Sequence, residues 1–329
     1  MRSALLAVVS IVVALAISEL GLRYAGSRVL ASRYWTESNH PYQPGDVDIV
    51  CIGESTTAGL WVDPSDSYPK KLEGKLRERL GTDRIRTIVP PHVGQNSSQQ
   101  ANRIADYLDL YRPRLLILMA GANNEWSLAE SHVTRFVSLD SLKSIKLRLT
   151  IFANSFRVFK LVRRGYLTFS NQWERNMNPG QNSLALWGDP EYTGWPPEGD
   201  VFGFARKHRE AFRALWKYDM KLMIDEARQR SVPVLLMTYP VMPKYLTPED
   251  FQQLASETGV PLVDNHASFD ALRASGTFEE YVFPQDHWHP NAKGYEIVAE
   301  SAANTILALD LLHASASVDS GSASGHQDR

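Results

Sequence analysis

The chain is poor in several features that mark specialised protein classes. It has a single cysteine among 329 residues, which excludes an intramolecular disulfide framework and a zinc site built from several cysteines. Its 35 Lys and Arg nearly balance its 37 Asp and Glu, and a net charge of −2 argues against a dedicated nucleic-acid binder. Only one long apolar run occurs, which excludes a polytopic membrane protein. The composition that remains, 43% apolar and 22% charged, is typical of a folded chain of one large domain with insertions or two modest domains.

The apolar run lies near the N-terminus, at residues 4–17, between Arg2 and Glu19. Its uncharged core is short for a bilayer-spanning helix, which needs about 20 residues, and it matches the apolar region of a signal peptide. We expect residues 1–25 to form an uncleaved membrane anchor. The alternatives are a cleaved signal peptide and a soluble amphipathic helix. An anchor would hold the protein on the extracytoplasmic side, periplasmic or at the cell surface, whereas a cleaved signal would give a secreted protein. At the other end, residues 314–329 are small and polar and predict a disordered tail.

Between residues 45 and 310, short β-rich runs alternate with helical patterns. The pattern predicts strands at residues 47–52, 85–89, 114–119, 232–238 and 260–264. It predicts helices at residues 68–80, 97–111, 204–230 and 291–309. Strands separated by helices form βαβ units. The predicted fold class is therefore α/β, a three-layer α/β/α, flavodoxin-like parallel sheet of about five strands in a domain at residues 45–310.

A long stretch between the third and fourth predicted strands exceeds what one crossover helix needs, so we expect a helical and loop insertion at about residues 127–215. Residues 141–173 carry seven basic residues and no acidic ones, interleaved with apolar residues. Three roles stay open: an extra helical layer packed on the body, a lid over the active site, and a basic face resting on anionic lipid. Five of the eight tryptophans fall in or beside the insertion, and such rings also stack on sugars: Trp126, Trp173, Trp187, Trp195 and Trp216.

Polar clusters follow the predicted strands at residues 53–57, 92–96 and 121–125, and another precedes the last helix at residues 286–290. The carboxyl ends of parallel strands share one edge of a sheet, so we expect these clusters to converge.

Together the clusters supply the parts of an activated hydroxyl nucleophile. Ser55 needs an adjacent base, which His289 provides, and Asp286 can hold the imidazole tautomer because it lies one turn away. The backbone N–H of Gly94 and the side-chain amide of Asn123 are expected to form an oxyanion hole, with the Ser55 N–H as a further donor.

On these residues the chain resembles the SGNH hydrolases, also called GDSL-type esterases, whose name lists Ser, Gly, Asn and His from four sequence blocks. Ser55, Gly94 and Asn123 match the first three blocks. The run Asp-x-x-His-Pro-Asn-x-x-Gly-Tyr at residues 286–295 matches the last and is the most specific part. The resemblance covers about residues 47–124 and 232–308. The apolar N-terminal segment followed by Glu-Leu-x-Leu-Arg is also similar to membrane-anchored bacterial members.

Two positions depart from the family pattern. Glu54 stands where the family has Asp and keeps the charge, and Asn124 stands where it has Asp and keeps the size and hydrogen bonding. We expect activity to survive both changes. Position 57 is Thr, so the Gly-x-Ser-x-Gly nucleophile elbow of α/β-hydrolases is absent.

The sequence thus predicts a serine esterase that hydrolyses an acyl or acetyl ester of a glycan or lipid through an acyl-enzyme on Ser55. The alternatives are an O-acyltransferase that uses the same site and a non-catalytic envelope assembly or binding protein. We expect no cofactor, and a metal site at Asp286, His287 and His289 is disfavoured because no second ligand cluster is evident in the sequence. The expected partners are the ester substrate and a membrane, not nucleic acid. The sequence predicts no oligomeric state.

Overall fold

The computed structural model describes residues 2–34, 46–90, 94–125, 127, 130–137 and 208–312, and ten residues between 145 and 162. The predicted tail and His92 lie outside the described residues, as do Trp126, Trp173, Trp187 and Trp195.

The core is a parallel sheet of five strands in the order β2-β1-β3-β4-β5. The strands are β1 (Val47–Gly53), β2 (Ile85–Ile88), β3 (Leu115–Met119), β4 (Val234–Met237) and β5 (Leu262–Val263). Nearly every strand residue is buried, as expected for a parallel sheet covered on both faces. The predicted α/β fold is confirmed, although β5 is shorter than the run at residues 260–264.

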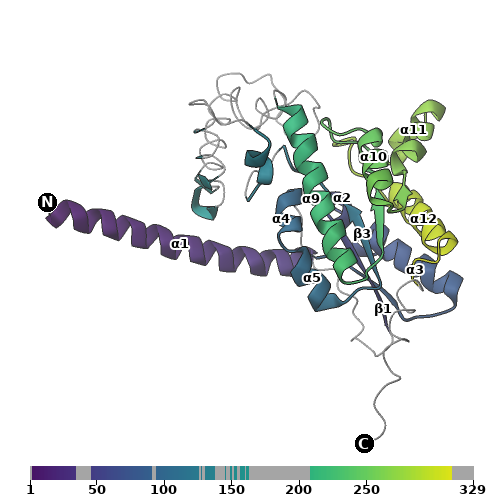
Figure 1. Cartoon of the computed structure of the whole chain (residues 1–329), viewed down its shortest axis with the longest axis horizontal. Helices are drawn as coiled ribbons and strands as arrows, with labels where there is room; N and C mark the ends of the chain where they lie inside the picture. Colours follow the sequence, from purple (N-terminus) through teal and green to yellow (C-terminus); the bar gives the residue numbers. More distant parts are fainter. Residues whose placement is uncertain are drawn as a thin grey trace, which may run out of the picture.

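Helices pack on both sides of this sheet (Figure 1). On one side α3 (Tyr68–Leu80) packs on α12 (Ala292–Ala308), which also contacts α11 (Asn265–Ser275). On the other side α9 (Arg209–Gln229) packs on α4 (Ser97–Ala101), α5 (Ile104–Tyr111) and α10 (Pro248–Thr258). The helices thus cover the two faces of the sheet, and the ends of the strands carry the loops.

The prediction of one helix over residues 97–111 is wrong, because the chain breaks between α4 and α5. The Arg103 N–H bonds to the Gln100 carbonyl, a tighter turn than an α-helix makes, and α5 begins at Ile104. The break lets both short helices pack on α9. The last helix also begins later than predicted, at Ala292, with Asn291 as its cap and Pro290 outside it.

The N-terminal segment is a single helix, α1 (Arg2–Tyr34), that projects away from the sheet (Figure 1). Glu19 on α1 is only 9% exposed, and its carboxylate accepts the Val158 N–H at 3.0 Å. Within the described residues, no helix combines the length and apolar character needed to cross a bilayer.

Candidate active site

Ser55 lies where β1 ends, as the first residue of the short helix α2 (Ser55–Ala58). Position 53, in the turn that leads to Ser55, requires glycine because a side chain there would clash with neighbouring atoms. A Cβ on Gly53 would lie 2.0 Å from Thr57 Oγ1 and 2.6 Å from the Met119 carbonyl oxygen. Because Gly53 pairs with Met119 of β3, the nucleophile turn sits tightly against the neighbouring strand.

His289 and Asp286 lie in the loop before α12, and backbone contacts hold this loop in place. Val282 and Pro290 form an antiparallel bridge, and the Phe283 N–H bonds to the His289 carbonyl at 2.9 Å. Asp286 Oδ1 accepts the N–H of His289 at 3.0 Å, while its Oδ2 lies 2.6 Å from His289 Nδ1. The spacing of three residues therefore produces the local carboxylate–imidazole bond that the sequence predicts.

The structure brings these groups to Ser55, whose Oγ lies 2.7 Å from His289 Nε2. With Nδ1 facing Asp286, Nε2 is the nitrogen left to accept the serine proton. Burial alone would raise the pKa of Asp286, but hydrogen bonds from His289 and from the Trp288 N–H outweigh it and lower that pKa. The carboxylate thus stays charged and can stabilise an imidazolium. Both side chains are 13% exposed and Ser55 is half-buried, so the cluster can be reached from solvent.

The two predicted oxyanion donors lie in the loops that follow the strands on either side of β1. Gly94 comes after β2 and has φ 75°, in the left-handed region that favours glycine. Asn123 comes after β3 and is half-buried, and its backbone carbonyl accepts the Ser127 N–H at 2.8 Å. Since β2, β1 and β3 are neighbours, Gly94, Ser55 and Asn123 all belong to loops at one edge of the sheet.

Glu54, one of the two departures from the family pattern, ties the Ser55 turn to the loop after β3. Its Oε1 accepts the Gly121 N–H at 2.6 Å and its Oε2 lies 2.6 Å from Tyr239 Oη. The Ala122 N–H donates to the same tyrosine oxygen at 3.0 Å. Burial raises the pKa of Glu54 to about 7, and the bonds from Tyr239 and Gly121 oppose that shift. Glu54 is therefore a positioning group for the loop that carries Asn123.

Asn124, the other departure, links the loops after β2 and β3, because its Oδ1 accepts the Ser97 N–H at 2.8 Å. An acceptor oxygen makes this bond without a negative charge, which explains how Asn can replace Asp here.

A second polar cluster lies nearby and was not predicted. Asp219 of α9 is fully buried, and its Oδ2 accepts the hydroxyls of Ser97 at 2.6 Å and Ser98 at 2.7 Å. Its Oδ1 lies 2.6 Å from His132 Nδ1. We call Ser97, Ser98, His132 and Asp219 the Asp219 cluster. Trp216, one helical turn before Asp219, donates its indole N–H to the Ala120 carbonyl at 2.8 Å and is a core residue.

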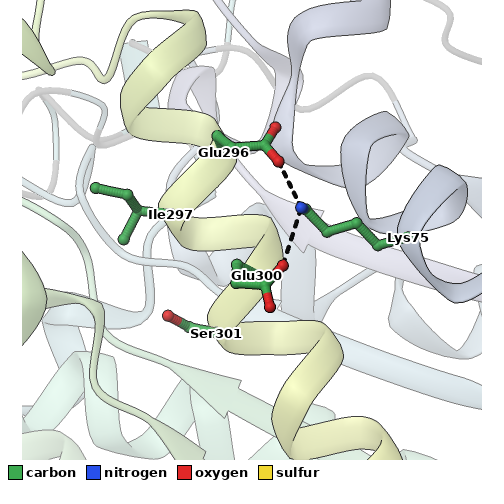
Figure 2. Close-up of a pocket in the computed structure, with 5 residues that line it drawn as sticks. All are labelled: Lys75, Glu296, Ile297, Glu300 and Ser301. Atoms are coloured by element: carbon green, nitrogen blue, oxygen red, sulfur yellow. Dashed lines mark ion pairs between the residues drawn. The ribbon is translucent and has the colours of Figure 1, made fainter. Parts of the chain in front are cut away.

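The hollow shown in Figure 2 lies between α3 and α12, and none of Ser55, Asp286 and His289 lines it. Lys75 bridges Glu296 and Glu300 across it, so its charges are already paired. In the described part of the chain, no three His, Cys, Asp or Glu side chains gather as a metal site would require. The four loops around Ser55 are thus the candidate active site.

Known structures resemble this fold at low identity. An esterase EstA from Pseudoalteromonas sp., crystallised with monoethylphosphonate as inhibitor, is 15% identical, with 80% of this chain and 98% of that chain covered and a TM-score of 0.44. A lipase/acylhydrolase from Enterococcus faecalis is 13% identical, with 80% and 96% covered and a TM-score of 0.45. The acetyl xylan esterase AlAXEase is 14% identical, with 79% and 100% covered and a TM-score of 0.44. No curated protein matches the chain.

A family model settles the assignment where these distant structures do not. The model of the GDSL-like Lipase/Acylhydrolase family matches residues 51–297, which is more than half of the chain and contains all four loops of the site. The chain belongs to the GDSL-like lipase/acylhydrolase family and is a serine hydrolase that acts on ester bonds.

Proposed function

We propose that the protein hydrolyses a carboxylic ester of a glycan or lipid through an acyl-enzyme on Ser55. The observation that carries this proposal is the 2.7 Å contact between Ser55 Oγ and His289 Nε2, with Asp286 on the other ring nitrogen. Ser55 Oγ attacks the ester carbonyl while His289 takes its proton. The negative charge on the carbonyl oxygen is stabilised by the Ser55 and Gly94 N–H groups and the Asn123 amide.

His289 then returns the proton to the leaving alcohol, and the acyl group remains on Ser55. In the second half of the reaction His289 deprotonates a water molecule, which attacks the acyl carbonyl; the bond to Ser55 Oγ breaks, His289 returns the proton to that oxygen, and the acid is released. Asp286 supports both halves, because its carboxylate stabilises the imidazolium each time it forms.

Fluorophosphonate labelling followed by peptide mass analysis tests the nucleophile. We expect one label, on the peptide that contains Ser55, and none on the Ser55→Ala variant. Equal labelling of both proteins would refute the assignment.

An ester panel then defines the substrate, comparing acetylated sugars with long-chain esters of glycerol. A preference for one of these two classes shows whether the enzyme acts on acetyl esters or on long-chain acyl esters. Formation of a new sugar ester when an acceptor sugar is added, in place of free acid, would identify acyl transfer instead of hydrolysis.

We further propose that residues 1–25 attach the enzyme to a membrane, with the catalytic domain on the extracytoplasmic side. The support is the apolar run at residues 4–17 and the exposure of five large apolar side chains in that run, which are 50–67% exposed: Leu6, Val9, Val13, Leu15 and Ile17. Fractionation of a C-terminally tagged chain tests this. Full-length protein in the membrane pellet supports attachment, and a shortened soluble form supports signal cleavage.

A further inference from the structure

The insertion presents a row of apolar side chains to solvent. Ile145, Leu149, Phe152, Phe156 and Phe159 recur along the sequence at alternating intervals of four and three residues, although Phe156 itself is not helical. All five are exposed, by 38–65%, and Phe152 and Phe156 stack edge to face with ring centres 5.1 Å apart. Large exposed apolar patches on a folded protein mark sites of contact with another protein or with a membrane, so we expect one of these to cover this row.

Hydrogen bonds join the segment that carries this row to α1. Glu19 accepts the Val158 N–H at 3.0 Å, and Arg157 Nη1 donates to the Leu22 carbonyl at 3.0 Å. Arg23, one turn after Glu19, donates to the other Glu19 oxygen at 2.7 Å. Figure 1 shows the described pieces of this segment away from the sheet, on the side toward which α1 projects.

The exposed apolar row of the insertion therefore lies in a segment that is hydrogen-bonded to α1 near Glu19. We call the exposed apolar side chains of the insertion the lipid-docking surface: Ile145, Leu149, Phe152, Phe156, Phe159, Leu161 and Val162.

The sequence around these apolar residues indicates what they contact. Residues 141–173 contain seven basic and no acidic residues, although the whole chain is slightly acidic. Apolar side chains flanked by Lys and Arg match the boundary between the acyl chains and the phosphates of an anionic bilayer. A second copy packed through the same face would bring two acid-free basic stretches together, which is unfavourable.

We propose that the lipid-docking surface lies on an anionic membrane surface and forms a second membrane contact besides residues 1–25. This inference extends the membrane attachment proposed above. The insertion leaves the sheet after β3, directly beyond the loop that carries Asn123, and returns through α9. Docking would hold the catalytic edge close to the bilayer, where esters of lipids or of membrane-linked glycans are found.

The single cysteine allows a direct test on the full chain. Cys51 is fully buried and burial raises its thiol pKa to about 12, so a thiol reagent reacts with an introduced cysteine instead. Phe152→Cys is labelled with the environment-sensitive fluorophore NBD. The matched control is Ala274→Cys, at an exposed position of α11 remote from α1. Circular dichroism melting confirms that both labelled proteins fold.

Each protein is reconstituted in vesicles of phosphatidylcholine alone or mixed with phosphatidylglycerol, with nitroxide groups on the acyl chains as quenchers. We expect the label at position 152 to shift to shorter wavelengths and to be quenched, more strongly in the mixed vesicles, while the label at position 274 is unaffected. Equal quenching in both vesicle types would overturn the assignment of an anionic surface.

A vesicle-bound chain with no quenching at position 152 would overturn this inference and leave the attachment by residues 1–25 intact. A chain that neither sediments with vesicles nor shows quenching would overturn both. A spectral shift that follows protein concentration without vesicles would assign the surface to a second copy of the chain.

Discussion

Two clusters in this protein contain the same residue types and bonds of similar length, yet only one is arranged for catalysis. In the first, His289 stands in the middle, with Ser55 Oγ at 2.7 Å on one ring nitrogen and Asp286 at 2.6 Å on the other. In the Asp219 cluster the carboxylate stands in the middle, and the Ser97 and Ser98 hydroxyls donate to it.

The order of the groups decides what each cluster can do. A serine hydroxyl becomes nucleophilic when an imidazole takes its proton, and a buried carboxylate that accepts the hydroxyl bond only fixes the side chain. Exposure separates the clusters too, since Ser97, Ser98 and Asp219 are fully buried while Ser55 is half-buried. Residue types and distances alone would not distinguish a reactive site from a structural one.

The strongest test of this contrast replaces one serine in each cluster. We expect Ser55→Ala to lower kcat/KM by a factor on the order of 10⁴–10⁶, because the covalent route is lost. Ser97→Ala should leave kcat/KM within about tenfold of wild type, since its hydroxyl only donates to Asp219. Steady-state kinetics on a soluble ester measures both, and a comparable loss in the two variants would show that the clusters are not functionally distinct.

Removing the central carboxylate of the Asp219 cluster should affect stability and not chemistry. Asp219→Ala leaves the buried hydroxyls of Ser97 and Ser98 without their acceptor and removes the partner of the part-buried His132, which should lower the free energy of unfolding by roughly 3–5 kcal/mol. The matched control is Asp225→Ala on the same helix, whose side chain is 56% exposed and which should change stability by less than about 0.5 kcal/mol. Urea denaturation followed by circular dichroism measures both. Loss of kcat without loss of stability in Asp219→Ala would contradict the structural role.

A smaller effect is expected at Asn123, where the reactive cluster needs a donor for the developing oxyanion. Asn123→Ala should lower kcat by roughly 10²–10³-fold with little change in KM, because the amide acts mainly in the transition state. Asn304→Ala, a change far from the site at a residue bonded to Arg79, is the control. A change confined to KM would make Asn123 a substrate-binding residue.

The smallest effect concerns the buried carboxyl of Glu54 and the pH dependence of stability. Its ordinary pKa is 4.5 and burial raises it to about 7, so between these values the folded chain holds a proton that the unfolded chain has lost. The free energy of unfolding should therefore fall as the pH rises from about 4.5 to about 7, by on the order of 2–3 kcal/mol from this residue. Glu54→Gln, which cannot ionise, should lose that part of the decline.

Urea denaturation midpoints at pH 5 and pH 7 measure this dependence. Glu210→Gln, at a residue whose side chain is 81% exposed, should keep the decline of the wild type. An unchanged pH dependence in Glu54→Gln would show that Glu54 is not the titrating group.

The sequence was informative wherever a signal was local. Runs of apolar residues predicted the strands, and the order of strands and helices predicted the parallel sheet. The spacing of Asp286 and His289 predicted their mutual bond, because three residues span one turn. The sequence also contains signals for the ends of α10, although no helix was predicted there. Thr247 caps its start, Pro248 is its first residue and Gly259 caps its end.

Contacts between distant segments could not be read from the sequence. Asp219 lies mid-helix, 122 residues from Ser97 and 87 from His132, with no spacing that relates them. Tyr239 reaches Glu54 across 185 residues. Such partners are set by how α9 and the strand ends come together in space. The roles of Ser55, Gly94, Asn123, Asp286 and His289 remain predictions that the variants above test.

The bond that completes the reactive cluster joins residues 234 positions apart, because Ser55 follows the first strand and His289 precedes the last helix. During synthesis, the nucleophile therefore leaves the ribosome well before its base. An interrupted translation product therefore carries a serine that nothing activates, and it also lacks α12, which covers α3. Esterase activity can arise only after the segment that carries His289 has docked against the Ser55 turn.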